Sequence, residues 1–164
     1  MPDDVNEALT RHAEAVATVR AFAERSGALR VVLLVDPGAG AEPTMLDCGP
    51  GGALELTDAG RTFEIEAAAR VDAAPRALPD IRPAPPTTMS IDPETGELEA
   101  PLGAVANLAR AVLDLARAFG GRSVATADFE TRDPQLPFTI AAREGEPLVL
   151  AAADRRFVLP EGVV

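Results

Sequence analysis

Two side chains in this sequence are of types that act as general bases or nucleophiles, and each occurs once: His12 and Cys48. An imidazole can accept a proton or form a pH-sensitive contact. A thiol becomes a nucleophile when a neighbouring base lowers its pKa. His12 falls on an apolar stripe between Leu9 and Val16, so we interpret it as a half-buried side chain or a pH-sensitive contact. Cys48 precedes a glycine-rich turn, and we interpret it as a small buried residue.

Four carboxylates surround a predicted turn: Asp92, Glu94, Glu97 and Glu99. The standard calcium loop alternates its acidic ligands and ends in a bidentate glutamate, and this run does neither. We therefore expect a solvated acidic face. The glycine-rich stretches at 38–40 and 48–52 do not open a helix after a strand, as phosphate-binding loops do. They are predicted to be hairpin connections, and we expect no bound metal or cofactor.

The composition excludes several kinds of chemistry. All 15 basic residues are arginine, so neither a Walker-type lysine nor a Schiff-base lysine is present. A single cysteine forms no disulfide within the chain, and one cysteine with one histidine cannot build a four-ligand zinc site. The formal charge of −11 argues against nucleic acid as a direct partner. This inventory predicts a protein that is not an enzyme.

The same composition gives an expectation about location. No stretch approaches the roughly 20 apolar residues that a membrane-spanning helix needs, so no membrane association is expected. The acidic start of the chain does not have the pattern of a signal peptide. A lone cysteine is compatible with a reducing compartment. We therefore expect a cytoplasmic protein.

Two parts of the sequence resemble each other. Residues 19–37 match 116–134 at an offset of 97, and residues 43–66 match 137–160 at an offset of 94. The identities fall at turns and at alternate strand positions, which predicts an internal duplication. Three of the aligned pairs are arginines, and with Arg110 they are candidate contacts for an anion or an acidic partner: Arg20, Arg25, Arg61, Arg110, Arg117, Arg122 and Arg155. The alternative is that they are surface arginines paired with nearby acids.

Each half is predicted to be a helix followed by a strand meander. Apolar residues at steps of three and four indicate one helix from about residue 5 to Gly27 and another from about 102 to Gly120. Alternating patterns then predict strands at 29–35, 44–48, 53–57 and 61–66, and at 123–131, 138–142, 148–151 and 155–159. Each half therefore contributes one helix to cover an antiparallel sheet.

The segment between the halves is rich in proline, and this composition predicts an extended linker over residues 67–86. Residues 92–96 form a predicted turn between short extended segments that lead to the second helix. The predicted organisation is a first repeat over 1–66, the linker, and a second repeat over 87–164, with both repeats in one domain. The fold class is α+β, with two helices packed on antiparallel sheet.

The predicted order of elements resembles the half-domain repeat of DNA sliding clamps. In that order a strand is followed by an amphipathic helix and several antiparallel strands, and the order occurs twice. The likeness is greatest in the second half, from Ala118-Phe119-Gly120-Gly121 through Val124–Thr131 and Asp133-Pro134 to the closing Phe157-Val158-Leu159-Pro160. The resemblance implies a ring of domains around duplex DNA, basic inward-facing helices, and a pocket for short peptides. The first predicted helix carries more acidic than basic side chains, and a single two-repeat domain cannot encircle DNA alone.

These observations predict a non-enzymatic interaction or scaffold domain that self-associates, with any other protein partner unidentified. The physical reason is that two meanders leave edge strands, which must be paired, covered or charged. Two alternatives remain open. One is a small-molecule binder or enzyme that uses a cavity between sheet and helices, with His12 in it. The other is a clamp-like accessory of DNA replication or repair.

Overall fold

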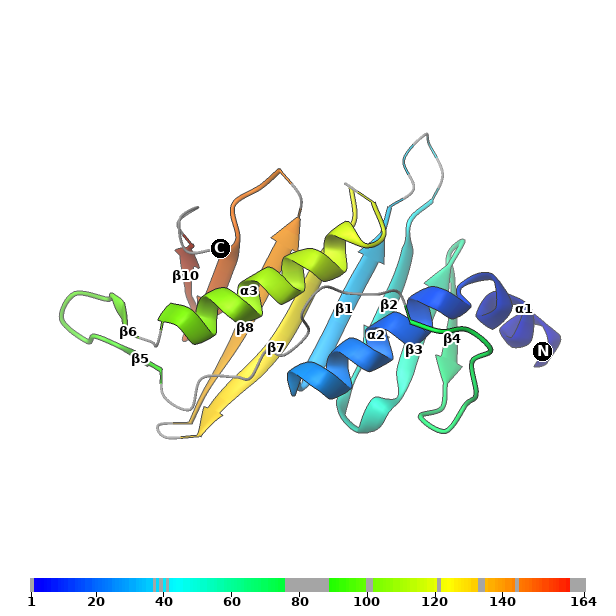
Figure 1. Cartoon of the computed structure of the whole chain (residues 1–164), viewed down its shortest axis with the longest axis horizontal. Helices are drawn as coiled ribbons and strands as arrows, with labels where there is room; N and C mark the ends of the chain where they lie inside the picture. The colour runs from blue at the N-terminus through cyan, green and yellow to red at the C-terminus, as the bar shows by residue number, and fades with distance from the viewer. Residues whose placement is uncertain are drawn as a thin grey trace.

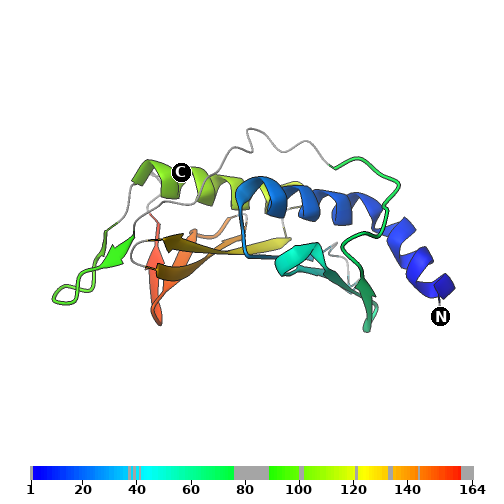
Figure 2. The same ribbon diagram turned by 90° about the horizontal axis from the view of Figure 1, so that it is seen from below.

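Eight antiparallel strands form a single sheet in the order β10-β9-β8-β7-β1-β2-β3-β4. In this computed structural model the described residues are 2–36, 38, 40, 42–75, 89–99, 102–120, 122–132, 135–143 and 145–159. Helices pack on one side of the sheet, which confirms the α+β class (Figures 1 and 2). No helix among these residues has the length and apolar character to cross a membrane.

The first half runs from two helices into four strands. Its elements are α1 (Pro2–Arg11), α2 (Ala13–Ser26), β1 (Arg30–Val35), β2 (Thr44–Cys48), the 3-10 turn η1 (Pro50–Gly52), β3 (Leu54–Asp58) and β4 (Arg61–Ile65). The second half has a small hairpin, one helix and four strands. They are β5 (Ser90–Ile91), β6 (Leu98–Glu99), α3 (Leu102–Arg117), β7 (Val124–Arg132), β8 (Gln135–Arg143), β9 (Val149–Ala152) and β10 (Arg155–Val158).

The predicted strands and the hairpin around residues 92–96 are confirmed, with ends shifted by a few residues. Of the predicted linker, residues 67–75 form turns and irregular structure, and 76–86 lie outside the described residues. Some residues used to compare the two halves and to draw the likeness to sliding clamps also lie outside the described residues: Pro37, Gly121, Asp133, Pro134 and Pro160.

The single helix predicted at the start of the chain is wrong, because the helix breaks at His12. The backbone there has φ −114° and ψ 22°, which separates α1 from α2. Backbone hydrogen bonds nevertheless continue across the break, from the amide of His12 to Ala8 and from the amide of Val16 to His12. The spacing of apolar residues along the sequence is therefore almost that of one continuous helix, and it does not indicate the break. At its other end α2 stops as predicted, on Gly27 in the left-handed conformation.

One offset relates the strand pairs of the two halves. Adding 94 to the residue numbers of a pair in the first half gives a pair in the second, as these three cases show: Val31↔Cys48 and Ala125↔Ala142, Met45↔Thr57 and Thr139↔Ala151, Leu56↔Phe63 and Leu150↔Phe157. In the central pairing of β1 with β7, Val32 lies opposite Thr126, which is also the residue that the offset of 94 assigns to Val32. A pseudo-twofold axis therefore passes between β1 and β7 at this pair.

The offset of 97 that sequence identity gave for the first strand is wrong in register. It would match buried Val31 with Asp128, whose side chain points to the other side of the sheet. A shift of an odd number of residues moves every side chain of a strand to the opposite face. The common architecture of the halves is a structural fact, whereas its origin by duplication stays a prediction.

The core lies between the helices and one face of the sheet. Buried positions alternate with half-buried ones along β7 up to Thr131 and along β8 from Phe138, as a sheet covered on one face requires. Phe129 and Phe138 stack at this face with ring centroids 5.5 Å apart. Phe22 of α2 is also fully buried. Both halves contribute to a single hydrophobic cluster, so they share one core.

Candidate interaction surface

The sheet residues that point away from the helices form a second surface, which we call the open face. No helix among the described residues covers it (Figure 2). Two of its large apolar side chains are plainly exposed, Met45 at 37% and Val158 at 65%. Soluble domains bury such side chains against another layer where one is available. Within the residues that the structure describes, the open face is therefore the side of the sheet without a second layer.

A single row of side chains crosses all eight strands of the open face. The strand registers place its members in line from β10 to β4: Val158, Val149, Ala141, Thr126, Val32, Asp47, Glu55 and Glu64. The part on β10, β9, β8, β7 and β1 carries no charge, and the part on β2, β3 and β4 consists of carboxylates. Beside this row, Leu34 of β1 lies between Val124 and Met45 and extends the apolar area.

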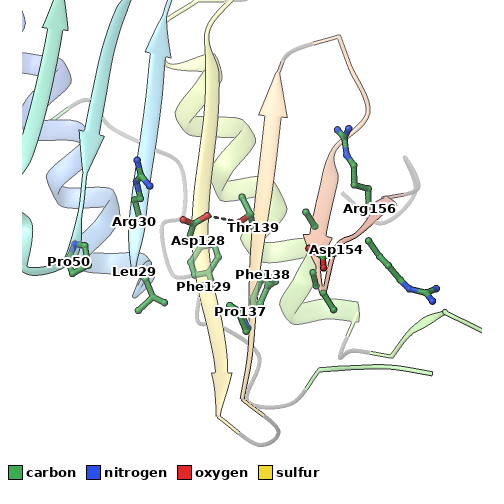
Figure 3. A pocket seen from close by; sticks show the side chains of 14 residues that line it. Leu29, Arg30, Pro50, Asp128, Phe129, Pro137, Phe138, Thr139, Asp154 and Arg156 are labelled. Carbon is green, nitrogen blue, oxygen red and sulfur yellow. Dashed lines mark hydrogen bonds between the residues drawn. The ribbon is translucent and has the colours of Figure 1, made fainter. Parts of the chain in front are cut away.

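Charged groups near the middle of the open face bond to one another across strands. The guanidinium of Arg30 makes a two-pronged contact with the carboxylate of Asp47, with Nε 2.8 Å from Oδ1. This hydrogen bond and the nearby negative charges of Asp47, Asp128 and Glu55 raise the pKa of Arg30. On the other side of Arg30, Asp128 accepts a 2.6 Å hydrogen bond from the hydroxyl of Thr139 (Figure 3). These bonds hold the polar groups of the centre in fixed positions.

One end of the open face is hollowed. The hollow has a volume of about 620 Å³, and Leu29 and Pro50 lie at one side of it and Arg156 at the other (Figure 3). Asp128, Pro137 and Thr139 also line it. The open face therefore combines apolar positions and bonded polar groups with a concave end.

Both edges of the sheet are flanked by other elements and carry arginines. At the β4 edge, Arg11 and His12 approach Asp58, which precedes the turn into β4. At the β10 edge, Arg155 packs so closely on the turn of the β5–β6 hairpin that a Cβ at Gly96 would overlap its guanidinium. The two flanking elements, α1 and the hairpin, lie at opposite ends of the sheet (Figure 1). Short, charged edges disfavour strand-to-strand association.

The structure places His12 at the bend between α1 and α2, beside an acid. Its Nε2 lies 3.3 Å from Oδ2 of Asp58, and Nη1 of Arg11 lies 3.0 Å from the same oxygen. The contact joins the helix bend to the β3–β4 turn. The contacts found for His12 and for Cys48 involve different residues, so the described structure gives no His–Cys pair for nucleophilic catalysis.

Cys48 is buried at 1% exposure, beside a hollow of about 500 Å³ that Arg20 and residues 49–52 also line. Burial raises the pKa of its thiol, and the positive charge of Arg20 offsets part of that rise. A raised pKa means that the protonated thiol predominates at neutral pH, and only the thiolate is strongly nucleophilic. The small buried residue expected from the sequence is what the structure contains.

We expect native Cys48 to react with Ellman's reagent at neutral pH on the order of 100-fold more slowly than in the denatured chain, because access requires local opening. The measurement is the absorbance of released thionitrobenzoate with and without denaturant. The denatured protein is the internal control, since it has the same single thiol. Complete labelling of the native protein at the denatured rate would contradict this expectation.

The arginines that the repeat singled out lie in different surroundings. Arg20 of α2 donates to the carbonyls of Ala69 and Glu66, at 2.7 and 2.6 Å, and ties the segment after β4 to the helix. Its aligned counterpart Arg117 is exposed at the end of α3. Arg110 and Arg117 partly offset the burial that raises the pKa of Asp114, which lies between them on that helix.

The remaining members of the set also differ in their contacts. Arg61 lies over the ring of Phe63 at 5.2 Å, whereas its counterpart Arg155 contacts the hairpin turn. Arg25 is exposed in the last turn of α2, and Arg122 lies beside Gly38. These contacts give no single symmetric anion site within the described part of the chain.

The acidic run shapes its turn. Oδ1 of Asp92 accepts hydrogen bonds from the amides of Glu94 and Thr95, and these bonds lower the pKa of Asp92. No group of three or more histidine, cysteine or acidic side chains in the described residues is arranged to hold a metal ion. The carboxylate of Asp92 therefore acts as a turn cap.

Sequence reasoning missed the polar residues that the open face brings together, Arg30, Asp47 and Asp128. The available signal was the alternation of charged and aliphatic residues along the predicted strands. No family model, curated protein or solved structure matches this chain.

Proposed function

We propose that this protein is a non-enzymatic interaction scaffold that self-associates through the open face of its sheet. The observation that carries the proposal is the face itself, an eight-stranded surface with uncharged side chains on β7–β10 and β1 that no helix in the described part of the chain covers. A second copy of the chain is the occupant, because symmetric dimers are the commonest way in which a soluble protein covers such a surface.

The edges support a face-to-face contact over an edge-to-edge one. The edge strands are short and bear Arg61, Arg155 and Arg156. Pairing two β10 edges would bring Arg155 and Arg156 of both copies together, and like charges on paired strands cost stability. Self-association was expected from the edges on sequence grounds, and we now attribute it to the open face.

The first test is the mass of the protein in solution. Sedimentation equilibrium at about 10–100 µM should give a dimer, since this range detects dissociation constants in the micromolar range. Replacing Leu34 by glutamate places an unpaired charge at the centre of the face and should weaken the dimer by about 3 kcal/mol, on the order of 100-fold.

The matched control is Ala17→Glu, which puts the same charge on α2, on the other side of the sheet. This variant should dimerise as the wild type does, and circular dichroism should show that both variants remain folded. A monomeric wild-type protein at the highest concentration would overturn the proposal.

A further inference from the structure

We infer that α1 is a hinged arm that guards the β4 edge of the sheet, and that Asp58 holds the arm closed. When the arm opens, β4 can pair with β4 of a second copy of the chain. This inference concerns a different surface from the open face and goes beyond the function proposed above. It follows from the position of α1, from its few buried contacts and from the bend at His12.

Helix α1 lies beside the outer edge of β4. Among the described residues β4 is the last strand of the sheet, and β3 is its only partner. Both views place α1 beyond β4 (Figures 1 and 2). Glu7 and Arg11 of the helix line a small hollow of about 120 Å³ together with Arg61 and Phe63 of the strand. A further strand added beside β4 would have to enter this space, so the closed arm blocks strand addition.

The edge of β4 offers the groups that a second strand needs. Asp58 and Arg61 pair across a two-residue turn, so the backbone amides and carbonyls of Thr62 and Glu64 point away from β3. Antiparallel pairing of two β4 strands about Phe63 would set this ring against its own copy, and cross-strand aromatic pairs stabilise a sheet. Thr62 would then lie opposite Glu64 of the partner subunit, so no like charges would be directly opposed.

Few contacts other than those of Asp58 hold the arm in place. Among the α1 side chains that the structure describes, those of residues 5–11, Ala8 is the one that is buried. Oδ2 of Asp58 lies 3.0 Å from Nη1 of Arg11 and 3.3 Å from Nε2 of His12. A helix of 10 residues is not stable alone in water, so the arm unfolds when it opens. The break at His12 allows α2 to remain helical during this opening.

Amide hydrogen exchange in the full-length chain tests the role of Asp58. Asp58→Asn removes the charge and keeps the shape of the side chain, so exchange in residues 6–11 should become about fivefold faster, with no change in β7 and β8. The matched control is Asp47→Asn. Asp47 and Asp58 are both 14% exposed, and their arginine partners are 52% and 56% exposed. Exchange in residues 6–11 that does not respond to Asp58→Asn, or that responds equally to Asp47→Asn, would overturn this role.

Thr10→Pro tests the guarding role of the arm. Thr10 is exposed, and a proline there removes a helix hydrogen bond and clashes with the carbonyl of Asn6, so α1 should unfold while the core stays intact. The variant is made together with Leu34→Glu, which weakens any contact through the open face. Sedimentation equilibrium should then give an association constant at least about tenfold above that of Leu34→Glu alone.

Thr10→Ala in the same Leu34→Glu chain is the control, because alanine preserves the helix and should leave the association constant unchanged. Circular dichroism should show that the sheet remains folded in all three chains. An unchanged association constant in the proline variant, with residues 6–11 shown by exchange to be unfolded, would overturn the guarding role. Because Leu34→Glu is present throughout, this result is independent of whether the wild-type protein associates through its open face.

Discussion

Replacing Phe129 with alanine is expected to lower the free energy of unfolding by about 3–5 kcal/mol, the usual range for removing a phenylalanine from a core. Phe129 lies on β7, fully buried, and its ring stacks on Phe138 of the neighbouring strand. Its removal leaves a cavity in the core beside Phe138. Urea denaturation followed by circular dichroism measures the change, because the chain has no tryptophan or tyrosine for fluorescence.

The matched control for this variant is Phe63→Ala. Phe63 lies on the edge strand β4, where it is only partly buried and packs on the margin of the core. Its truncation should cost about 1 kcal/mol, since less surface returns to water. Equal losses for the two variants would show that the core is not centred at β7 and β8. Denaturation at several protein concentrations separates this change from any change in self-association.

Replacing Arg20 with methionine should destabilise the protein by about 2–4 kcal/mol. The variant keeps the aliphatic stem but loses two charge-assisted hydrogen bonds to the carbonyls of Ala69 and Glu66, each of which contributes about 1.5–3 kcal/mol before relaxation. Amide hydrogen exchange should accelerate in residues 66–71 and remain unchanged in β7 and β8. Arg25→Met, on the exposed side of the same helix, is the control and should change little.

The same variant has a second readout in Cys48. Arg20 lowers the pKa of this thiol against the larger effect of burial, so losing the positive charge should raise the pKa further. A titration of thiolate absorbance should therefore move to higher pH in Arg20→Met and stay in place in Arg25→Met. A shift to lower pH would mean that the variant has exposed the thiol to water.

Much of the fold was predictable because its strands are short and strongly patterned. Leu54 and Leu56 alternate with Glu55, and this spacing alone identifies β3 and its buried side. Turn residues mark the ends, as Gly27 does for α2 and Asp92 does for the β5–β6 turn. The existence and order of the elements depend on such local signals.

Register and the open face depend on pairing between distant segments, and local signals could not give them. The sequence comparison aligned identical residues, such as Arg20 with Arg117 and Asp36 with Asp133. The true correspondence of the strands is set by which side chains are buried, and it differs from that alignment. The contact of Arg30 with Asp47 requires β1 and β2 to pair at one particular register. The bend at His12 lies beside Asp58 of β3, and the helix pattern carries no signal of that contact. The resemblance to sliding clamps stays a prediction.

The meander order of the strands has a consequence for how the chain folds. Every strand pair within a half joins sequence neighbours, and β1–β7 is the pair in the large sheet that brings the two halves together. Contacts between near neighbours close small loops at low entropic cost, whereas the β1–β7 pair must close a loop that spans most of the chain. Low contact order within each half favours early formation of two separate hairpin stacks. The pairing of β1 with β7, with Val32 opposite Thr126, would then be the late step that sets the folding rate.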